Sequence, residues 1–161
     1  VGARVSAAVG SEEKKQFVKQ FGPELVINYQ TEDIKKIIEN KYGKRPINVF
    51  YDQVGGEAYE QGIKLLGSEG RALIVGFASG NIPSQTLSYL LVKNISIMGV
   101  FMISFENDDR DYLKKRMELI FDLYINQQIE PIYKTIKFDE VITYLDLIGS
   151  RNTVGRIVAL R

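Results

Sequence analysis

The stretch VFYDQVGG at residues 49–56, followed by GRALIVGFASG at residues 70–80, decides the fold of this chain. In each segment a short apolar run with β-branched residues ends abruptly in small residues. Parallel strands of an α/β sheet finish in this way at the edge where the sheet meets its ligand. The pattern therefore predicts two parallel strands whose carboxyl ends carry the chemistry of the protein.

Apolar, strand-like runs alternate with longer helical patterns on both sides of this stretch. Strands joined by helices of about 10 to 15 residues form right-handed βαβ crossovers in a parallel sheet. The sequence therefore predicts an α/β protein with a Rossmann-like, doubly wound parallel sheet. The expected strands are residues 4–9, 24–28, 47–51, 71–76 and 95–102, and the expected helices begin after Ser11, after a Thr31 cap, near Glu57 and near Ser84. A long helix is expected after Asn107, Asp108 and Asp109, followed by a strand at 131–136, a helix at 139–148 and a strand at 156–160.

Composition narrows the class of partner. The 161 residues include 21 Lys and Arg against 20 Asp and Glu, so net charge does not favour nucleic acid or an anionic membrane, and a small molecule is the expected partner. The sequence contains no Cys and no His, which excludes disulfides, Cys or His zinc sites and His-activated nucleophiles within it. No apolar run approaches the roughly 20 residues that span a bilayer, and we expect a cytoplasmic protein.

Three polar residues follow the first two expected strands. Ser11 and Lys14 come directly after the first, and Tyr29 closes the second. A hydroxyl with a cation at such a strand end suits the 2′-phosphate of NADP, whereas NAD calls for an acid there. The competing interpretation is that Ser11 is only a helix cap, Lys14 a solvated charge and Tyr29 an amphipathic residue at a strand end.

The later strand ends offer a second group of candidates. Val54 lies in the loop after the third strand, Gly76 and Phe77 end the fourth, and Val100 and Met102 end the fifth. Glycines in such loops let the backbone approach a ligand closely. Asp52 is better explained as a cap or loop acceptor than as a general base, and the string GFASG misses the GxSxG nucleophile pattern by one place.

Taken in order, RVSAAVGSEEK, VINY, VFYDQVGG, GRALIVGFASG and LLVKNISIMGV resemble the cofactor-binding half of the quinone oxidoreductase branch of the medium-chain, zinc-type alcohol dehydrogenase-like superfamily. The resemblance implies NADPH-dependent reduction of quinones or α,β-unsaturated carbonyl compounds by hydride transfer. It places Ser11, Lys14 and Tyr29 around the adenosine 2′-phosphate, and Val54, Gly76 and Phe77 along the nicotinamide ribose and pyrophosphate. It also gives Val100 and Met102 backbone bonds to the carboxamide, and it implies a homodimer through the edge strand at 95–102. No metal site and no catalytic residue are assigned.

The sequence also departs from that family. It lacks the GroES-like substrate domain, the first strand and the AxxGGVG-type loop, so it resembles a C-terminal fragment without the first βα unit. Residues 1–128 are expected to form a partial nucleotide-binding domain, and residues 129–161 a segment returning to the missing catalytic domain. Such a fragment is expected to bind NADPH weakly and to catalyse nothing by itself. The alternative is a non-catalytic Rossmann-like module for oligomerisation or partner binding.

Overall fold

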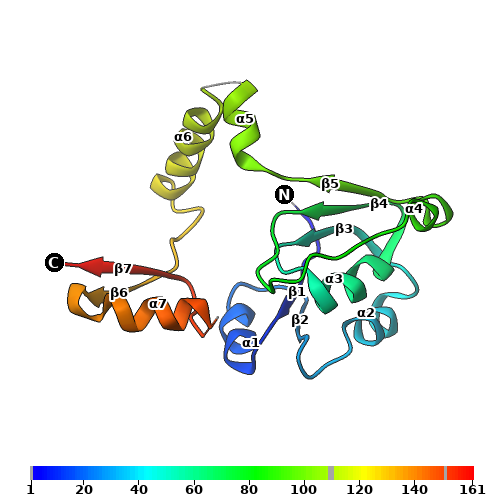
Figure 1. Ribbon diagram of the computed structural model, residues 1–161, viewed down its shortest axis with the longest axis horizontal. Coiled ribbons are helices and arrows are strands. Elements are labelled where there is room, and N and C mark those ends of the chain that lie inside the picture. The colour runs from blue at the N-terminus through cyan, green and yellow to red at the C-terminus, as the bar shows by residue number, and fades with distance from the viewer. Residues whose placement is uncertain (1, 109–110, 151) are drawn as a thin grey trace. The chain divides into compact units, whose positions relative to one another are not determined.

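The computed structural model describes residues 2–108, 111–150 and 152–161 (Figure 1). The chain divides into two compact units, Val1–Met102 and Ile103–Arg161. Asp109, which was expected to precede the long helix of the second unit, lies outside the described residues.

Parallel strands and helices alternate along the first unit, as the sequence predicts. Strand β1 pairs with β2, and β3, β4 and β5 form a second sheet in that order, with every pairing parallel. The α/β class and the Rossmann-like parallel arrangement are thereby confirmed. The strands are β1 (Ser6–Val9), β2 (Leu25–Asn28), β3 (Ile47–Asp52), β4 (Leu66–Ile74) and β5 (Ser96–Gly99), and the helices are α1 (Glu12–Lys19), α2 (Ile34–Tyr42), α3 (Gly56–Gly62), the 3-10 turn η1 (Ile63–Leu65) and α4 (Leu87–Lys93).

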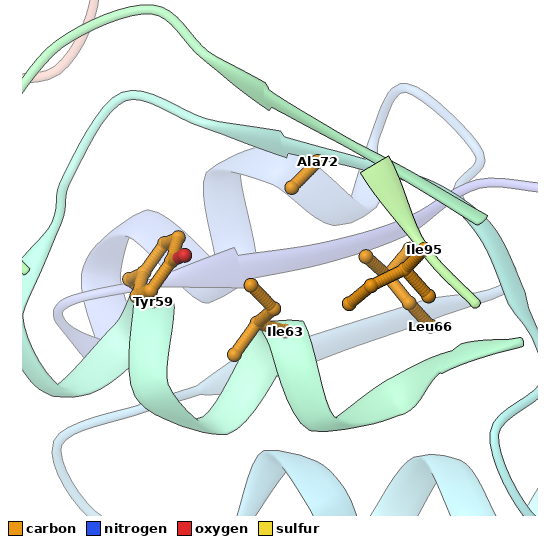
Figure 2. Packing of buried hydrophobic residues seen from close by; sticks show 5 residues of the cluster. All are labelled: Tyr59, Ile63, Leu66, Ala72 and Ile95. Carbon is orange, nitrogen blue, oxygen red and sulfur yellow. The ribbon is translucent and has the colours of Figure 1, made fainter. Parts of the chain in front are cut away.

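The main core lies where α3 and η1 cover one face of the three-stranded sheet. Tyr59 and Ile63 project from this helical segment towards Ala72 of β4, and Leu66 and Ile95 close the cluster (Figure 2). Leu66 and Ala72 are completely buried. Burying such apolar side chains contributes about 25 cal/mol per Å² of apolar surface, so this cluster fixes the position of β3 and β4 and of the loops that follow them.

A second core holds α2 beside the shorter sheet. Ile34 and Ile38 lie one turn apart on α2 and pack with Ile27 of β2 and with Leu65 of η1. Because Leu65 and Leu66 are neighbours in the chain but belong to different clusters, the two cores join at this point. The shorter sheet is therefore anchored to the longer one through buried side chains.

Several expected boundaries differ from the structure, and three of them bear on the sheet of the first unit or on its helix caps. Strand β4 begins at Leu66 rather than Arg71, because Leu66 pairs with Ile47 before the register shifts between Leu66 and Arg71, where Glu69 has a φ of 63°. Helix α2 is capped by Asp33, whose carboxylate accepts the N–H of Lys36 at 2.9 Å, and not by Thr31. The fifth strand stops at Gly99, and Met102 begins a short helix.

The second unit contains helices followed by a small parallel pair of strands. Strand β6 pairs with β7 in parallel, and Ile136 of β6 is buried. Other apolar side chains of this unit are exposed, among them Ile125 and Ile142. Its elements are α5 (Met102–Asp108), α6 (Tyr112–Ile125), β6 (Tyr133–Lys137), the 3-10 turn η2 (Phe138–Glu140), α7 (Val141–Gly149) and β7 (Arg156–Leu160).

Candidate cofactor-binding site

The loops that follow β3 and β4 are joined to each other by backbone hydrogen bonds. The N–H of Val75 donates to the carbonyl of Asp52 at 2.8 Å, and the N–H of Ala78 donates to that of Gln53 at 3.0 Å. Ser79 likewise donates to Val54 at 2.9 Å, and Gly56 donates to Asn81 at 3.0 Å. The pairing of the strands thus continues into residues 52–56 and 75–81, so the two loops form one rigid edge of the sheet.

The carboxylate of Asp52 holds the first of these loops in place through hydrogen bonds. Its buried carboxylate accepts the N–H of Val54 at 2.9 Å and the N–H of Gly55 at 3.1 Å. The charge of Asp52 also adds to the effect of burial, which is the larger cause, in raising the pKa of Tyr59. These contacts agree with the interpretation of Asp52 as a loop hydrogen-bond acceptor.

Glycine is required at position 55 of this edge. Its φ is +71°, and a methyl group there would lie 2.6 Å from the carbonyl oxygen of Asn81 and 3.2 Å from the ring of Phe77. A side chain at position 55 would therefore push apart the two joined loops. The glycine-rich character of YDQVGG arises from this close approach between the loops.

Ser11 and Tyr29 both lie near the end of β1, on either side of Gly10. The N–H of Tyr29 donates to the carbonyl of Val9 at 2.9 Å, which places its ring over Gly10. Ser11 has an extended backbone, and its Oγ accepts the N–H of Lys14 at 3.2 Å, so Ser11 caps α1. Lys14 lies in the first turn of α1, where its side chain is half-buried. Ser11 follows Gly10, Tyr29 packs against Gly10, and the N–H of Lys14 binds Ser11, so we call these three residues the polar group around Gly10.

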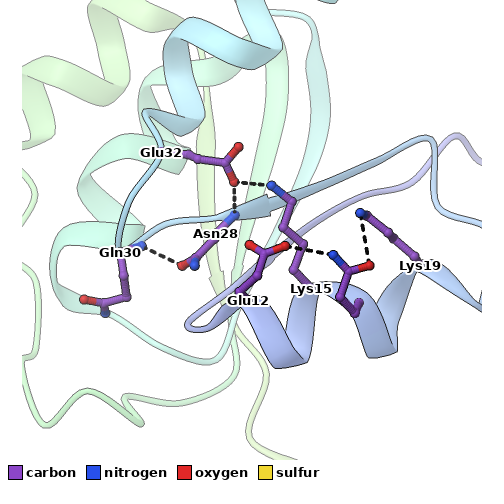
Figure 3. A network of polar contacts seen from close by, with 7 residues as sticks. Glu12, Lys15, Lys19, Asn28, Gln30 and Glu32 are labelled. Carbon is purple, nitrogen blue, oxygen red and sulfur yellow. Dashed lines mark hydrogen bonds and ion pairs between the residues drawn. The ribbon is translucent and has the colours of Figure 1, made fainter.

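An ion pair beside this group was not anticipated from the sequence. The ammonium of Lys15 contacts the carboxylate of Glu32 at 2.5 Å, and that carboxylate also accepts the N–H of Asn28 at 2.7 Å (Figure 3). The hydrogen bond between them raises the pKa of Lys15 and lowers that of Glu32. Lys15 and Glu32 lie far apart in sequence and meet because β1 pairs with β2 in parallel, with Val9 opposite Asn28. No local sequence pattern indicates this contact.

The remaining candidates lie on the three-stranded sheet. Val54 and Gly76 are half-buried within the joined loops, and the ring of Phe77 is 39% exposed. The N–H of Val100 donates to the carbonyl of Ile74 at 2.9 Å, so this residue offers a ligand its carbonyl rather than its N–H. Met102 begins α5 instead of extending the strand, and its side chain is exposed.

The candidates therefore fall into two groups, each at the carboxyl ends of parallel strands. Ser11, Lys14 and Tyr29 follow β1 and β2, whereas Val54, Gly76, Phe77 and Val100 follow β3, β4 and β5. A cavity of about 670 Å³ is lined by Tyr29 of the first group and Val54 of the second. The arrangement presents hydroxyl groups and a cation on one side and glycine-rich backbone on the other, which suits an extended nucleotide.

Among residues 2–108, 111–150 and 152–161, no group of three or more Asp and Glu side chains is placed to hold a metal ion. Within the same residues, no helix has the length and apolar character needed to cross a membrane.

Comparison with known proteins identifies relatives along the whole chain. Residues 1–122 match the family described as zinc-binding dehydrogenase. The chain is 30% identical over 160 residues to quinone oxidoreductase-like protein 2 of Rattus norvegicus, covering 97% of this chain and 45% of that protein. It is 28% identical over 172 residues to prostaglandin reductase-3 of Mus musculus, covering 96% of this chain and 44% of the relative. The chain thus spans less than half the length of these curated relatives.

A solved structure shows the same fold. The quinone oxidoreductase of Escherichia coli, complexed with NADPH, superposes with a TM-score of 0.87 over 99% of this chain and 50% of that chain, at 22% identity. At this level of identity the likeness concerns the arrangement of helices and strands.

Proposed function

This chain belongs to the zinc-binding dehydrogenase family, as a quinone oxidoreductase-like member of the medium-chain dehydrogenase/reductase superfamily, and from that membership we propose that it is the cofactor-binding part of an NADPH-dependent reductase. The substrates proposed for the whole protein are quinones or other α,β-unsaturated carbonyl compounds. Bound NADPH supplies the hydride, and the residues of this chain hold and orient it. The relatives are oxidoreductases, which supports an enzymatic role at the level of the family.

The polar group around Gly10 carries the proposal. No acid stands at the end of β1, where one would bind the ribose 2′-hydroxyl of NADH and repel a phosphate. The Oγ of Ser11 accepts from Lys14 N–H and keeps its own hydrogen to donate to a phosphate oxygen. Lys14 adds a positive charge and Tyr29 a hydroxyl on the same side. We therefore assign Ser11, Lys14 and Tyr29 to the adenosine 2′-phosphate of NADPH.

The second group is assigned to the other end of the cofactor. Val54, Gly76 and Phe77 would line the nicotinamide ribose and pyrophosphate, since the joined loops present backbone and small side chains there. Val100 would accept a hydrogen bond from the carboxamide through its carbonyl, and Met102 would lie beside it. We assign no metal and no proton-transferring residue to this chain.

The compartment, the assembly and the domain organisation of the whole protein are proposals as well. We propose that the reductase works in the cytoplasm as a homodimer through residues 95–102, because β5 pairs with β4 on one side only among the described strands and Met98 is half-exposed. Residues 1–128 would form the nucleotide-binding part and residues 129–161 would return to a substrate domain. The isolated chain would bind NADPH weakly and have no turnover of its own.

Titration with both cofactors tests the central assignment. We expect the 161-residue chain to bind NADPH at least tenfold more tightly than NADH at low salt, measured by cofactor fluorescence. Lys14→Ala should remove most of this preference and leave NADH affinity unchanged, because only the 2′-phosphate distinguishes the cofactors. Lys19→Ala is the matched control, since Lys19 lies in the last turn of the same helix.

Three results would contradict the proposal in different ways. Equal affinity for the two cofactors, unchanged by Lys14→Ala, would show that the 2′-phosphate assignment is wrong. No binding of either cofactor, together with a stable assembly of the chain, would favour the alternative function of a non-catalytic Rossmann-like module. Measurable NADPH-dependent reduction of a quinone by the chain alone would contradict its proposed inactivity.

A further inference from the structure

The turn between β2 and α2 carries Tyr29 and folds back on a single residue, Asn28. The N–H groups of Thr31 and Glu32 donate to the carbonyl of Asn28 at 3.1 and 2.8 Å. The N–H of Gln30 donates to its side-chain oxygen at 3.1 Å. Asn28 is only 5% exposed, so it anchors the turn in the protein interior. These bonds give the turn a defined conformation.

Glu32 closes this turn and joins it to α1. Its Oε2 accepts the N–H of Asn28 at 2.7 Å and a hydrogen bond from the ammonium of Lys15 at 2.5 Å (Figure 3). One carboxylate oxygen thus holds both the backbone of the turn and a side chain of the neighbouring helix. Hydrogen bonds between two charged groups are among the strong ones. The side chains of Lys15 and Glu32 are 17% and 32% exposed, so their contact is partly shielded from water.

Lys15 is also bonded to Ser11 through its backbone. The N–H of Lys15 donates to the carbonyl of Ser11 at 3.0 Å, and the N–H of Lys14 donates to the Oγ of Ser11 at 3.2 Å. The backbone of Lys15 therefore belongs to the first turn of α1, while its ammonium reaches the turn that follows β2. Ser11 and Tyr29, which we assign to one phosphate, come from these two segments. The ion pair links the two segments directly.

The position of Tyr29 depends on this link. Its N–H donates to the carbonyl of Val9 at 2.9 Å, and its hydroxyl lies against Gly10. Asn28, the residue before it, is held by Glu32. A turn released from α1 would therefore carry the hydroxyl of Tyr29 away from Gly10. Groups that bind a ligand are effective when their neighbours hold them in one geometry.

The charges of the pair offer a second way in which it could act. Lys15 alone would attract a phosphate, and Glu32 alone would repel one. If the pair acted through charge, removing the charge of Lys15 would weaken phosphate binding and removing that of Glu32 would strengthen it. If the pair acts by holding the turn, both removals weaken binding. The structure favours the second case, because opposite charges in contact largely cancel at a distance.

We propose that Lys15 and Glu32 are positioning residues that set how strongly the site prefers NADPH over NADH, because their ion pair holds the turn bearing Tyr29 against α1. The inference rests on the proposed function, since it deepens the assignment of Ser11, Lys14 and Tyr29 to the 2′-phosphate. We assign neither Lys15 nor Glu32 a contact with the cofactor.

Cofactor titration of the 161-residue chain at low salt tests the proposal. Lys15→Met and Glu32→Gln each break the ion pair with little change of side-chain length, and they change the net charge in opposite directions. We expect each to reduce the preference for NADPH over NADH by about threefold or more, the size expected of a partly exposed ion pair. The double variant should lose no more than either single variant, because all three lack the same contact.

Two control variants and a second measurement separate positioning from a general loss of stability. Lys15→Arg can still pair with Glu32 and should keep the preference. Gln16→Ala should keep it too, since Gln16 is the next residue of the same helix and bonds only within that helix among the contacts described. Without cofactor, amide exchange of Tyr29 should accelerate in Lys15→Met and Glu32→Gln about threefold more than that of Ala72, which reports opening of the main core.

The possible results have different consequences. Opposite changes of preference in Lys15→Met and Glu32→Gln would overturn the inference in favour of a direct effect of charge. An unchanged preference, or exchange at Tyr29 that only follows Ala72, would show a structural role alone and would leave the proposed function intact. Equal affinity of the wild-type chain for NADPH and NADH would contradict the assignment of the 2′-phosphate itself, and this inference with it.

Discussion

The hydroxyl group of Tyr29 lies directly over Gly10, so that a methyl group at position 10 would stand 2.6 Å from Oη and 3.1 Å from Cζ. Tyr29 reaches this place because its N–H binds the carbonyl of Val9. The small residue at the end of β1 and the aromatic residue at the end of β2 therefore fit each other, and each depends on the other.

Replacing Gly10 with alanine should displace the ring of Tyr29. Gly10 has no positive φ that alanine would strain, so the close contact is the main cost, and we expect a loss of about 1 to 3 kcal/mol in the free energy of unfolding. Urea denaturation measures it. The loss should shrink when Tyr29→Phe removes Oη, since the nearest remaining ring atom is farther away. An equal loss in both backgrounds would show that Tyr29 does not cause it.

Replacing Gly62 with alanine should destabilise the main core. The new methyl group would collide with the ring of Phe50, whereas an alanine in a helix is otherwise favoured over glycine by about 1 kcal/mol. We expect a net loss of about 1 to 3 kcal/mol, measured as a lower midpoint in thermal and urea unfolding. Gly99→Ala is the control, because no atom lies within 4 Å of the added carbon. Phe50→Leu should recover part of the loss if the collision is its cause.

Removing the carboxylate of Asp52 should loosen the edge of the sheet. Asp52→Ala leaves the N–H groups of Val54 and Gly55 without their acceptor and should cost about 1 to 3 kcal/mol. Asp52→Asn keeps one acceptor oxygen and should cost less. Hydrogen exchange at Val54 and Gly55 should accelerate in the same order. If the two substitutions were equally harmful, the charge of Asp52 would matter more than its hydrogen bonds.

The pair of Lys15 and Glu32 should make stability depend on pH. The pKa of Glu32 is lowered from 4.5, so its contribution is present above that pH and is lost as pH falls through the folded value. The pKa of Lys15 is raised from 10.5, so its contribution is present below that pH and is lost as pH rises further. Glu32→Gln should therefore lower stability at neutral pH and differ less from wild type under acid conditions. Urea titrations at several pH values check this, and a difference that stayed constant into acid would contradict it.

The fold was predictable because each strand carries its own local signal. Short apolar runs identified all five strands of the first unit, and the apolar spacing of Ile34 and Ile38 identified α2. Asp33 was missed as a helix cap because Thr31 also fits the capping pattern, and only the structure shows which oxygen reaches a backbone N–H. The start of β4 was missed because Leu66 reads as the end of a helix until its pairing with Ile47 is known.

The site was predictable only in part, since its pieces are assembled by pairing between distant segments. Ser11 and Tyr29 were both proposed from their positions at strand ends, and the structure places Tyr29 against Gly10, the neighbour of Ser11. The contact of Lys15 with Glu32 depends on the register of β1 against β2, which no local pattern encodes. Val100 and Met102 were expected on one strand, but the chain turns into a helix between them because β5 ends at Gly99.

The bonds that tie residues 52–56 to residues 75–81 also limit how the sequence can vary. An insertion or deletion in either loop would shift one row of donors against the other row of acceptors. A length change after β3 would then be tolerated only with a matching change after β4. Changes of length in these two segments, which are some twenty residues apart in the chain, would thus have to occur together, both in evolution and in protein design.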